Sequence, residues 1–278
     1  MPMFTRYEGA AWEERFLPRL TSKQIKELPK ESTLVILPVG AIEQHGPHLP
    51  VMTDTLIGEA TVTLALEKLM PDARVWLLPP VSYGKSNEHL GLPGTISLSA
   101  TTLQSVIMDI AESLRLSGFH KLLLFNTHGG NTDLLNVVSR EIRIRHDMLV
   151  FYLSPSSLGG AEDLMPADEL EYGIHGGDYE TSIVKAIKPG WVQDQWLVSE
   201  TPSMTGQKFL TLEGKIRFAW RMADISDSGI CGDATQATAA KGSIIQERVT
   251  DILAEVFREL SKFEFSDIRA RAEAGAER

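Results

Sequence analysis

Histidine and carboxylate side chains recur beside glycines in three short segments of this 278-residue chain. Imidazole and carboxylate donors without a thiolate are typical of zinc, manganese or iron in a catalytic site, whereas a structural zinc site usually uses cysteine. If the segments meet in space, the residue types therefore predict a metal-dependent hydrolase. The candidate residues are Glu43, His45, Asp54, His128, His175 and Glu180.

The first segment follows an expected strand at Thr33–Val39. Side chains two residues apart on an extended backbone point the same way, so Glu43 and His45 should share a direction. Asp54 falls near the start of the next expected helix, with Thr53 as its cap, where the helix dipole favours a carboxylate. With its two oxygens, Asp54 could bridge two ions about 3.5–4 Å apart, as in two-metal hydrolases.

The other two segments repeat this geometry. His128 follows an expected strand at Lys121–Phe125, so it lies at a carboxyl end, where open α/β sheets place their ligands. If Asp178 caps the following helix, Glu180 lies in its first turn and His175 in the preceding loop. A Glu-x-His pair alone is a weak motif, and any one of these side chains could be an ordinary surface group. The prediction therefore depends on their convergence.

The segments need a scaffold that brings strand ends together. Short apolar runs are typical of strands buried on both faces, and stripes at spacings of three and four indicate helices between them. Alternating strands and helices predict an α/β sandwich with a mainly parallel sheet. The expected strands are 33–39, 74–78, 121–125 and 148–153, and the expected helices are 57–70, 103–114, 134–142 and 233–263.

Composition narrows the class of protein. The chain is 43% hydrophobic with a net charge of −10, which argues against nucleic acid or an anionic membrane as partner. No apolar run approaches a membrane span, the N-terminus lacks a signal-peptide core, and the lone Cys231 fits a reducing compartment. We expect one cytoplasmic domain, residues 1–278, with a polar tail at 264–278 that frays.

Two long connections, 79–94 and 154–177, are expected to be functional because loops of this length are uncommon inside a compact domain. Within the first, His89 could meet substrate, although an exposed loop histidine is the simpler interpretation. His48 is interpreted as a structural or supporting residue, and Cys231 as a small buried side chain.

At these residues the chain resembles the creatininase (creatinine amidohydrolase) family. The matching segments are LPVGAIEQHGPHLPVMTDT at 37–55, NTHGGN at 126–131, HGGDYETS at 175–182 and the stretch 224–246. The resemblance spans most of the chain. It implies a three-layer α/β/α sandwich, two divalent metal ions per subunit (zinc, manganese or iron), and assembly into a homo-oligomer such as a hexamer.

The resemblance also implies metal ligands. Glu43 and His128 would hold one ion, His45 the other, and Asp54 would bridge them. True creatinine hydrolases resemble N-G-H-Y-E-N at the second motif, where the glutamate binds the second ion, but this chain has Gly130 there. Creatinine itself is therefore a doubtful substrate. The His-Gly-Gly-Asn form is closer to branches that include formamide deformylases and a peptidase of peptide-derived cofactor maturation.

The expected reaction is hydrolysis of a non-peptide C–N bond in a small amide, lactam or formamide by metal-activated hydroxide. By resemblance His175 and Glu180 act in catalysis, although Glu180 could bind metal instead. Glu180 would accept the water proton, while His175 stabilises the oxyanion or protonates the leaving nitrogen. Two alternatives remain: a metal-dependent peptidase of the same family, and a non-catalytic binding protein on this scaffold.

Overall fold

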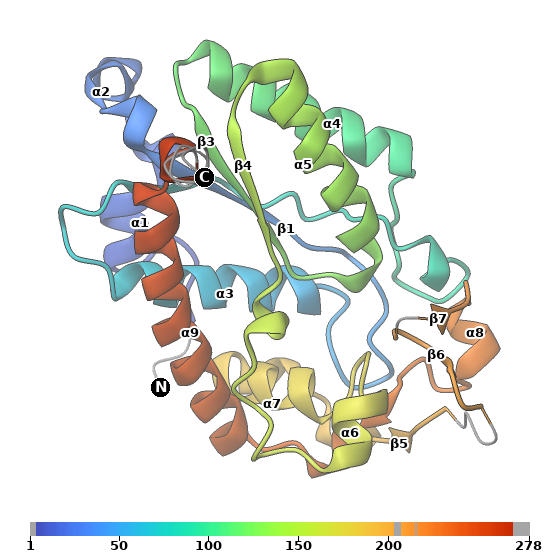
Figure 1. The fold of residues 1–278 in the computed structure, drawn as a ribbon. Coiled ribbons are helices and arrows are strands. Elements are labelled where there is room, and N and C mark those ends of the chain that lie inside the picture. The colour runs from blue at the N-terminus through green and yellow to red at the C-terminus, as the bar shows by residue number, and fades with distance from the viewer. Residues whose placement is uncertain (1–3, 203–206, 215, 269–278) are drawn as a thin grey trace, which may run out of the picture.

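The fold is built on a parallel sheet of four strands, seen in a computed structural model that describes residues 4–202, 207–214 and 216–268 (Figure 1). The strand order is β2-β1-β3-β4. Leu34 pairs with Val75 on one side of β1 and with Lys121 on the other. The strands are β1 (Leu34–Val39), β2 (Val75–Leu77), β3 (Lys121–Asn126) and β4 (Leu149–Leu153).

Helices cover both faces of this sheet, which confirms the predicted three-layer sandwich (Figure 1). On one face, α4 (Ala100–Leu116) and α5 (Thr132–His146) pack on one set of alternating strand residues, such as Leu37 and Leu122. The opposite set, which includes Ile36, packs against the other helical layer. That layer contains α1 (Ala10–Arg15), α3 (Thr53–Glu67), α7 (Asp178–Ile187) and α9 (Ala239–Lys262).

Smaller elements complete the described chain. Three short helices and two strand pairs extend from the sandwich: α2 (Ser22–Glu27), α6 (Ala167–Tyr172), α8 (Met222–Ile225), antiparallel β5 (Ser199–Glu200) with β8 (Gly232–Asp233), and parallel β6 (Leu210–Thr211) with β7 (Ile216–Arg217). Single 3-10 turns lie at Leu17–Arg19, Lys30–Ser32, Asn87–His89, Gly129–Asn131, Pro155–Leu158, Pro189–Trp191, Asp194–Trp196 and Ala234–Gln236.

Sheet order determines where a ligand can bind. From β1 the chain passes through α3 to β2 on one side, whereas β3 passes through α5 to β4 on the other. The connections therefore diverge between the carboxyl ends of β1 and β3. Such a switch point leaves a crevice that open α/β sheets use for binding.

Helix starts are where the sequence predictions fail. The long last helix begins at Ala239 rather than at Asp233, because Asp233 lies in β8 and a 3-10 turn follows it. Thr53 is the first residue of α3 rather than its cap, and its hydroxyl donates to Pro50 O at 2.7 Å. Asp178 is likewise the first residue of α7, after Gly177, and its carboxylate binds Ser182 and Lys241 instead.

The end of α9 is fixed to the sheet by a buried lysine. Lys121 Nζ donates to Ser261 O and Phe263 O, each at 2.9 Å, and pairs with Glu264 at 2.6 Å. The first residue of the tail predicted to fray is thus held in place, and residues 269–278 lie outside the described part. None of the helices in the described ranges has the length and apolar character that crossing a bilayer requires.

Candidate metal centre

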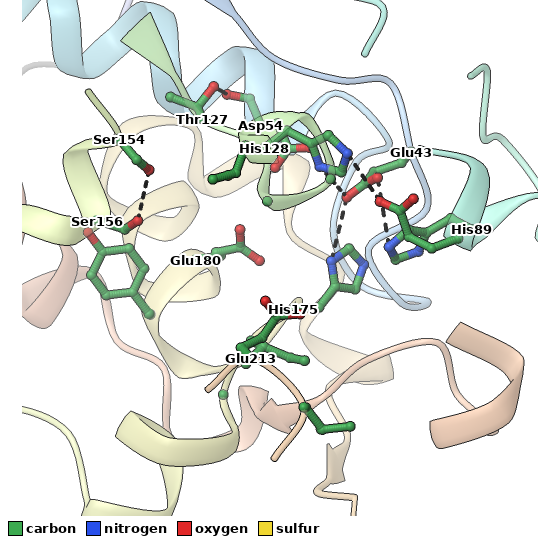
Figure 2. A pocket seen from close by; sticks show the side chains of 18 of the residues that line it. Glu43, Asp54, His89, Thr127, His128, Ser154, Ser156, His175, Glu180 and Glu213 are labelled. Atoms are coloured by element: carbon green, nitrogen blue, oxygen red, sulfur yellow. Dashed lines mark hydrogen bonds and ion pairs between the residues drawn. The ribbon is translucent and has the colours of Figure 1, made fainter. Parts of the chain in front are cut away.

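All six candidate residues meet at the switch point between β1 and β3. A cavity of about 900 Å³ opens there, and Figure 2 shows the His128 and His175 imidazoles turned toward the Glu43 carboxylate. Glu43 and His45 come from the segment after β1, and Asp54 from the first turn of α3. The remaining three are His128 from the segment after β3, His175 from the loop before α7, and Glu180 from the first turn of α7.

The first cluster joins three buried side chains. The Nδ1 atom of His128 lies 3.2 Å from Glu43 Oε1 and 3.4 Å from Asp54 Oδ2. One donor atom from each residue lies within 4.8 Å of the others, a spacing that can hold one ion. This is the pairing of Glu43 with His128 that the family resemblance implied.

The second cluster shares Asp54. His45 Nε2 lies 3.3 Å from Asp54 Oδ1 and 3.7 Å from Glu180 Oε2, and these donor atoms also lie within 4.8 Å of one another. The two oxygens of Asp54 therefore face different clusters, which is the arrangement a bridging carboxylate needs. Glu180 belongs to this second cluster and adds a carboxylate to it, whereas position 130 is a glycine without a ligand atom.

Three imidazoles at the centre each place one ring nitrogen against a main-chain carbonyl and turn the other toward a carboxylate. His45 Nδ1 contacts Glu43 O at 3.1 Å, His128 Nε2 contacts Lys85 O at 3.1 Å, and His175 Nε2 contacts Gln44 O at 2.7 Å. A carbonyl only accepts, so each of these nitrogens carries the hydrogen. In a neutral ring, the other nitrogen presents a lone pair to a carboxylate, so that two acceptors face each other. A cation between them, either a metal ion or a second proton on the ring, removes this repulsion.

His175 lies beside both clusters. Its Nδ1 atom is 3.6 Å from Glu43 Oε1, and its ring centroid lies 4.2 Å from that of His45 and 4.4 Å from that of His89. Burial and the nearby positive charge of His45 lower the pKa of His175 well below its ordinary value. With its Nε2–H bound to Gln44 O, the neutral ring presents Nδ1 as an acceptor for a hydrogen bond or as a ligand for a metal ion.

Several buried polar atoms at the centre lack a hydrogen-bond partner within the described residues. They include Glu43 Oε2, His45 Nε2 and Asp54 Oδ2. Burying such atoms unpaired is costly, whereas coordination of a cation would satisfy all three. The donor set and its unpaired atoms therefore fit divalent metal ions.

The carboxylates also change the proton affinity of their neighbours. Burial lowers the pKa of His45, but Asp54 and Glu180 outweigh it and raise the pKa to about 10. Burial, with the charge of Asp54, raises the pKa of Glu180 to about 7. Glu180 Oε2 accepts the Gly176 N–H at 2.7 Å. A carboxyl group with this pKa can both take up and release a proton near neutral pH.

Three residues at the centre were missed or misjudged from the sequence. His89 is buried rather than exposed, with Nε2 3.8 Å from Glu43 Oε2. Gln44 Nε2 lies 2.9 Å from His89 Nδ1 and donates to Gly229 O at 2.7 Å. Glu88 lies 3.4 Å from His128 Nε2. For His89 and Glu88 the signal was the long 79–94 connection, but its length did not indicate which residues turn inward.

The two other interpretations hold. His48 is buried, and its Nε2 atom lies 2.8 Å from Thr181 Oγ1 on α7, which agrees with a supporting role. Cys231 is fully buried and lies 4.0 Å from the sulfur of Met222.

The cavity has two kinds of wall. Its inner wall carries five of the six metal-site candidates, all but His45, together with Tyr179. The hydroxyls of Ser154 and Ser156 lie on the same wall (Figure 2). Its outer wall comes from the segment around β6 and β7, where Arg217 reaches across to pair with Asp133 on α5 at 2.6 Å. The outer wall thus connects the β6–β7 segment to α5, which packs with α4 on one face of the sheet.

This chain is similar to known proteins both in sequence and in fold. A Mycolicibacterium smegmatis protein named mycofactocin precursor peptide peptidase is 31% identical over 227 residues, covering 81% of this chain and 83% of its own. A creatinine amidohydrolase of Pseudomonas putida is 29% identical over 264 residues, covering 88% and 96%. A crystal structure from Bacteroides fragilis, named provisionally as a creatinine amidohydrolase, superposes with a TM-score of 0.76 at 27% identity, covering 91% and 98%.

Solved creatininases include a manganese form and a zinc–zinc form. The relatives are enzymes, so the prediction of a hydrolase acting on carbon–nitrogen bonds is confirmed at the level of the family, and a non-catalytic binding protein is not supported. The family model described as creatinine amidohydrolase matches residues 18–257. The chain therefore belongs to the creatininase family.

Proposed function

We propose that this protein is a two-metal amidohydrolase whose centre lies between β1, β3, α3 and α7. The observation that carries the proposal is the orientation of His45, His128 and His175. Each donates its outer N–H to a backbone carbonyl and turns its other nitrogen toward the carboxylate of Glu43 or Asp54. Outer-nitrogen hydrogen bonds of this kind fix the tautomer of a metal-binding imidazole.

The residues divide between two ions. Glu43, Asp54 and His128 would hold one, and His45, Asp54 and Glu180 the other, with Asp54 shared. Mixed nitrogen and oxygen donors suit zinc, manganese or iron, and the manganese and zinc–zinc forms of solved creatininases support the first two. We therefore propose two divalent ions per subunit.

Bound divalent ions would lower the pKa of water toward about 7 and polarise the substrate carbonyl. The protein supplies proton transfer and exclusion of water. Glu180 would either complete the ligand set of the second ion or, where it does not bind metal, accept a proton from water and return it to the leaving nitrogen. His175 would accept a hydrogen bond or complete the metal site, because its outer N–H is already bound to Gln44.

Replacing Asp54 tests the shared ligand. Asp54→Ala should lose most bound metal and about 100-fold or more in kcat, because both clusters lose one donor. Elemental analysis and turnover of an amide substrate measure the two effects. Glu213→Gln, which removes a carboxylate from the outer wall of the same cavity, should keep both metal and folded structure. Full metal content and activity in Asp54→Ala would contradict the proposal.

For the substrate, we propose a non-peptide amide, lactam or formamide, with a peptide as the second candidate. Two observations favour keeping the peptide. The peptidase from Mycolicibacterium smegmatis is at least as similar to this chain as the creatinine amidohydrolase. The cavity, about 900 Å³, is also near the upper end of the range of about 300–1,000 Å³ for drug-sized ligands. Cyclic amides, formamides and short peptides assayed side by side with zinc- and manganese-loaded enzyme would separate the two.

Three further predictions from the sequence belong to this proposal. The chain would function as one domain over 1–278, assemble into a homo-oligomer and act in the cytoplasm. Size-exclusion chromatography with light scattering tests the assembly.

A further inference from the structure

The segment that contains Lys85, Ser86 and Glu88 closes over the outer nitrogen of His128. His128 Nε2 lies 3.1 Å from Lys85 O, 3.2 Å from Ser86 Oγ and 3.4 Å from Glu88 Oε1. The opposite nitrogen of the same ring faces Glu43 and the shared carboxylate. The His128 ring is therefore held between the metal site on one side and a negative charge on the other.

The Glu88 carboxylate is itself fixed. Its Oε2 atom lies 3.3 Å from Lys85 Nζ, and its side chain is 14% exposed. Neither Glu88 nor Lys85 is among the residues whose donor atoms face Asp54. Glu88 thus has a defined position beside His128 that the metal centre as described does not use.

A glycine makes this position available. A Cβ atom at Gly130 would overlap the Glu88 carboxylate, and it would lie 2.5 Å from His128 Nε2 and 2.6 Å from Lys85 O. The backbone of Gly130 has no positive φ, so conformation alone does not demand glycine there. A residue with a side chain at position 130 is therefore incompatible with the observed position of the Glu88 carboxylate.

We propose that Glu88 is a positioning residue for the metal-binding His128, and that it occupies the space that a side chain at 130 would require. A carboxylate beside the outer N–H of a ligating histidine fixes the ring and makes its other nitrogen a stronger donor. The inference rests on the proposed two-metal function, since His128 must hold an ion for its orientation to matter. It predicts that Glu88 controls only the ion bound by Glu43, Asp54 and His128.

Metal titration of Glu88→Gln and Glu88→Ala tests this prediction. Zinc binding is measured by competition with a chromophoric chelator, which resolves two sites of different affinity. Both variants should still bind two ions at saturating zinc, with one site about 10- to 100-fold weaker and the other unchanged. Glu213→Gln, a matched loss of charge in the same cavity, should leave both affinities unchanged. Gly130→Ala keeps the Glu88 carboxylate but places a methyl group in the space that this carboxylate occupies. It should therefore weaken the same metal site.

Three outcomes would overturn the inference: wild-type affinity at both sites in the Glu88 variants, loss of one ion from them even at saturating zinc, and equal weakening of both sites. The second would make Glu88 a ligand, an assignment that its proximity to donor atoms of Glu43 and His89 permits. Melting of the metal-free Glu88→Gln protein at the wild-type temperature is expected and separates positioning from general loss of structure. If the wild-type protein binds no zinc, the proposed function itself fails, whatever the variants do.

Discussion

At the scale of single residues, orientation carries more information than proximity. Charged groups are common in clefts, but the rings of His45, His128 and His175 are each oriented by a hydrogen bond to a main-chain carbonyl. A random polar cluster has no reason to place one nitrogen of each of these three rings against a main-chain carbonyl and the other toward Glu43 or Asp54. The orientation is therefore better evidence for a cation than the count of ligand-type residues is.

Cys231 offers a residue-scale prediction that is independent of metal. Burial raises the pKa of its thiol to about 12. Because the unfolded pKa is about 8.5, raising the pH from 7 to 9 should strongly increase thiolate in the unfolded chain but leave the folded thiol neutral. We expect iodoacetamide at pH 8 to label the native protein about three orders of magnitude more slowly than the urea-unfolded protein, measured by mass spectrometry. Rapid labelling of the native protein would contradict the burial of this thiol.

The sequence revealed the donors on regular elements and missed those on irregular ones. His128 follows a strand and Glu180 lies in a first helical turn, so period and position were enough to place them. His89 and Glu88 lie in a connection whose path depends on contacts with distant segments, such as the hydrogen bond from Gln44 to Gly229. No local pattern records such contacts, and His89 was expected to be exposed for that reason.

At the scale of elements, the sheet was predictable because short, unbroken apolar runs between amphipathic helices are typical of buried parallel strands. Helix starts were not, because a cap is decided by local hydrogen bonds. Asp233 illustrates this, because its side chain accepts the Thr235 N–H and caps a 3-10 turn. The helix α9 therefore begins only at Ala239. Periodicity alone could not separate that turn from the helix after it.

The packing of α9 against α7 makes an element-scale prediction. A Cβ atom at Gly242 would overlap Ser182 O and lie 2.8 Å from Ile183 N, so the two backbones touch there. Gly242→Ala should lower the free energy of unfolding by about 1–3 kcal/mol, because backbone cannot move aside as a side chain can. Urea unfolding followed by circular dichroism measures the change.

Gly190 is the matched control, since a Cβ atom there meets nothing within 4 Å and its φ is not positive. Gly190→Ala should match or slightly exceed wild-type stability, because alanine restricts the unfolded chain. A stable Gly242→Ala protein would show that α7 and α9 can separate without cost.

At the scale of the whole molecule, stability should depend on the ions. Ligands that bind only the folded state stabilise it by about 2.7 kcal/mol at 100 times their dissociation constant. Because buried atoms of Glu43, His45 and Asp54 are unpaired without a cation, we expect the metal-free protein to be the less stable form. Zinc or manganese should therefore raise the melting temperature by several degrees in differential scanning calorimetry, and EDTA should reverse the rise.

The same experiment on Asp54→Ala should show little or no shift with zinc, because both sites lose a donor. Magnesium, which prefers all-oxygen coordination, should raise the wild-type melting temperature less than zinc does. If no divalent ion changed the melting temperature of the wild-type protein, that result would contradict the proposed metal centre.

The position of α3 has one more consequence. This helix is buried along nearly its whole length between the sheet and its neighbours α7 and α9, and its first turn carries Asp54 while the first turn of α7 carries Glu180. Tightly packed helices, not loops, thus set the separation of these two carboxylates. The outer wall around β6 and β7 can accordingly be exchanged by engineering or by natural divergence, so that new compounds are admitted while the reactive geometry is inherited intact.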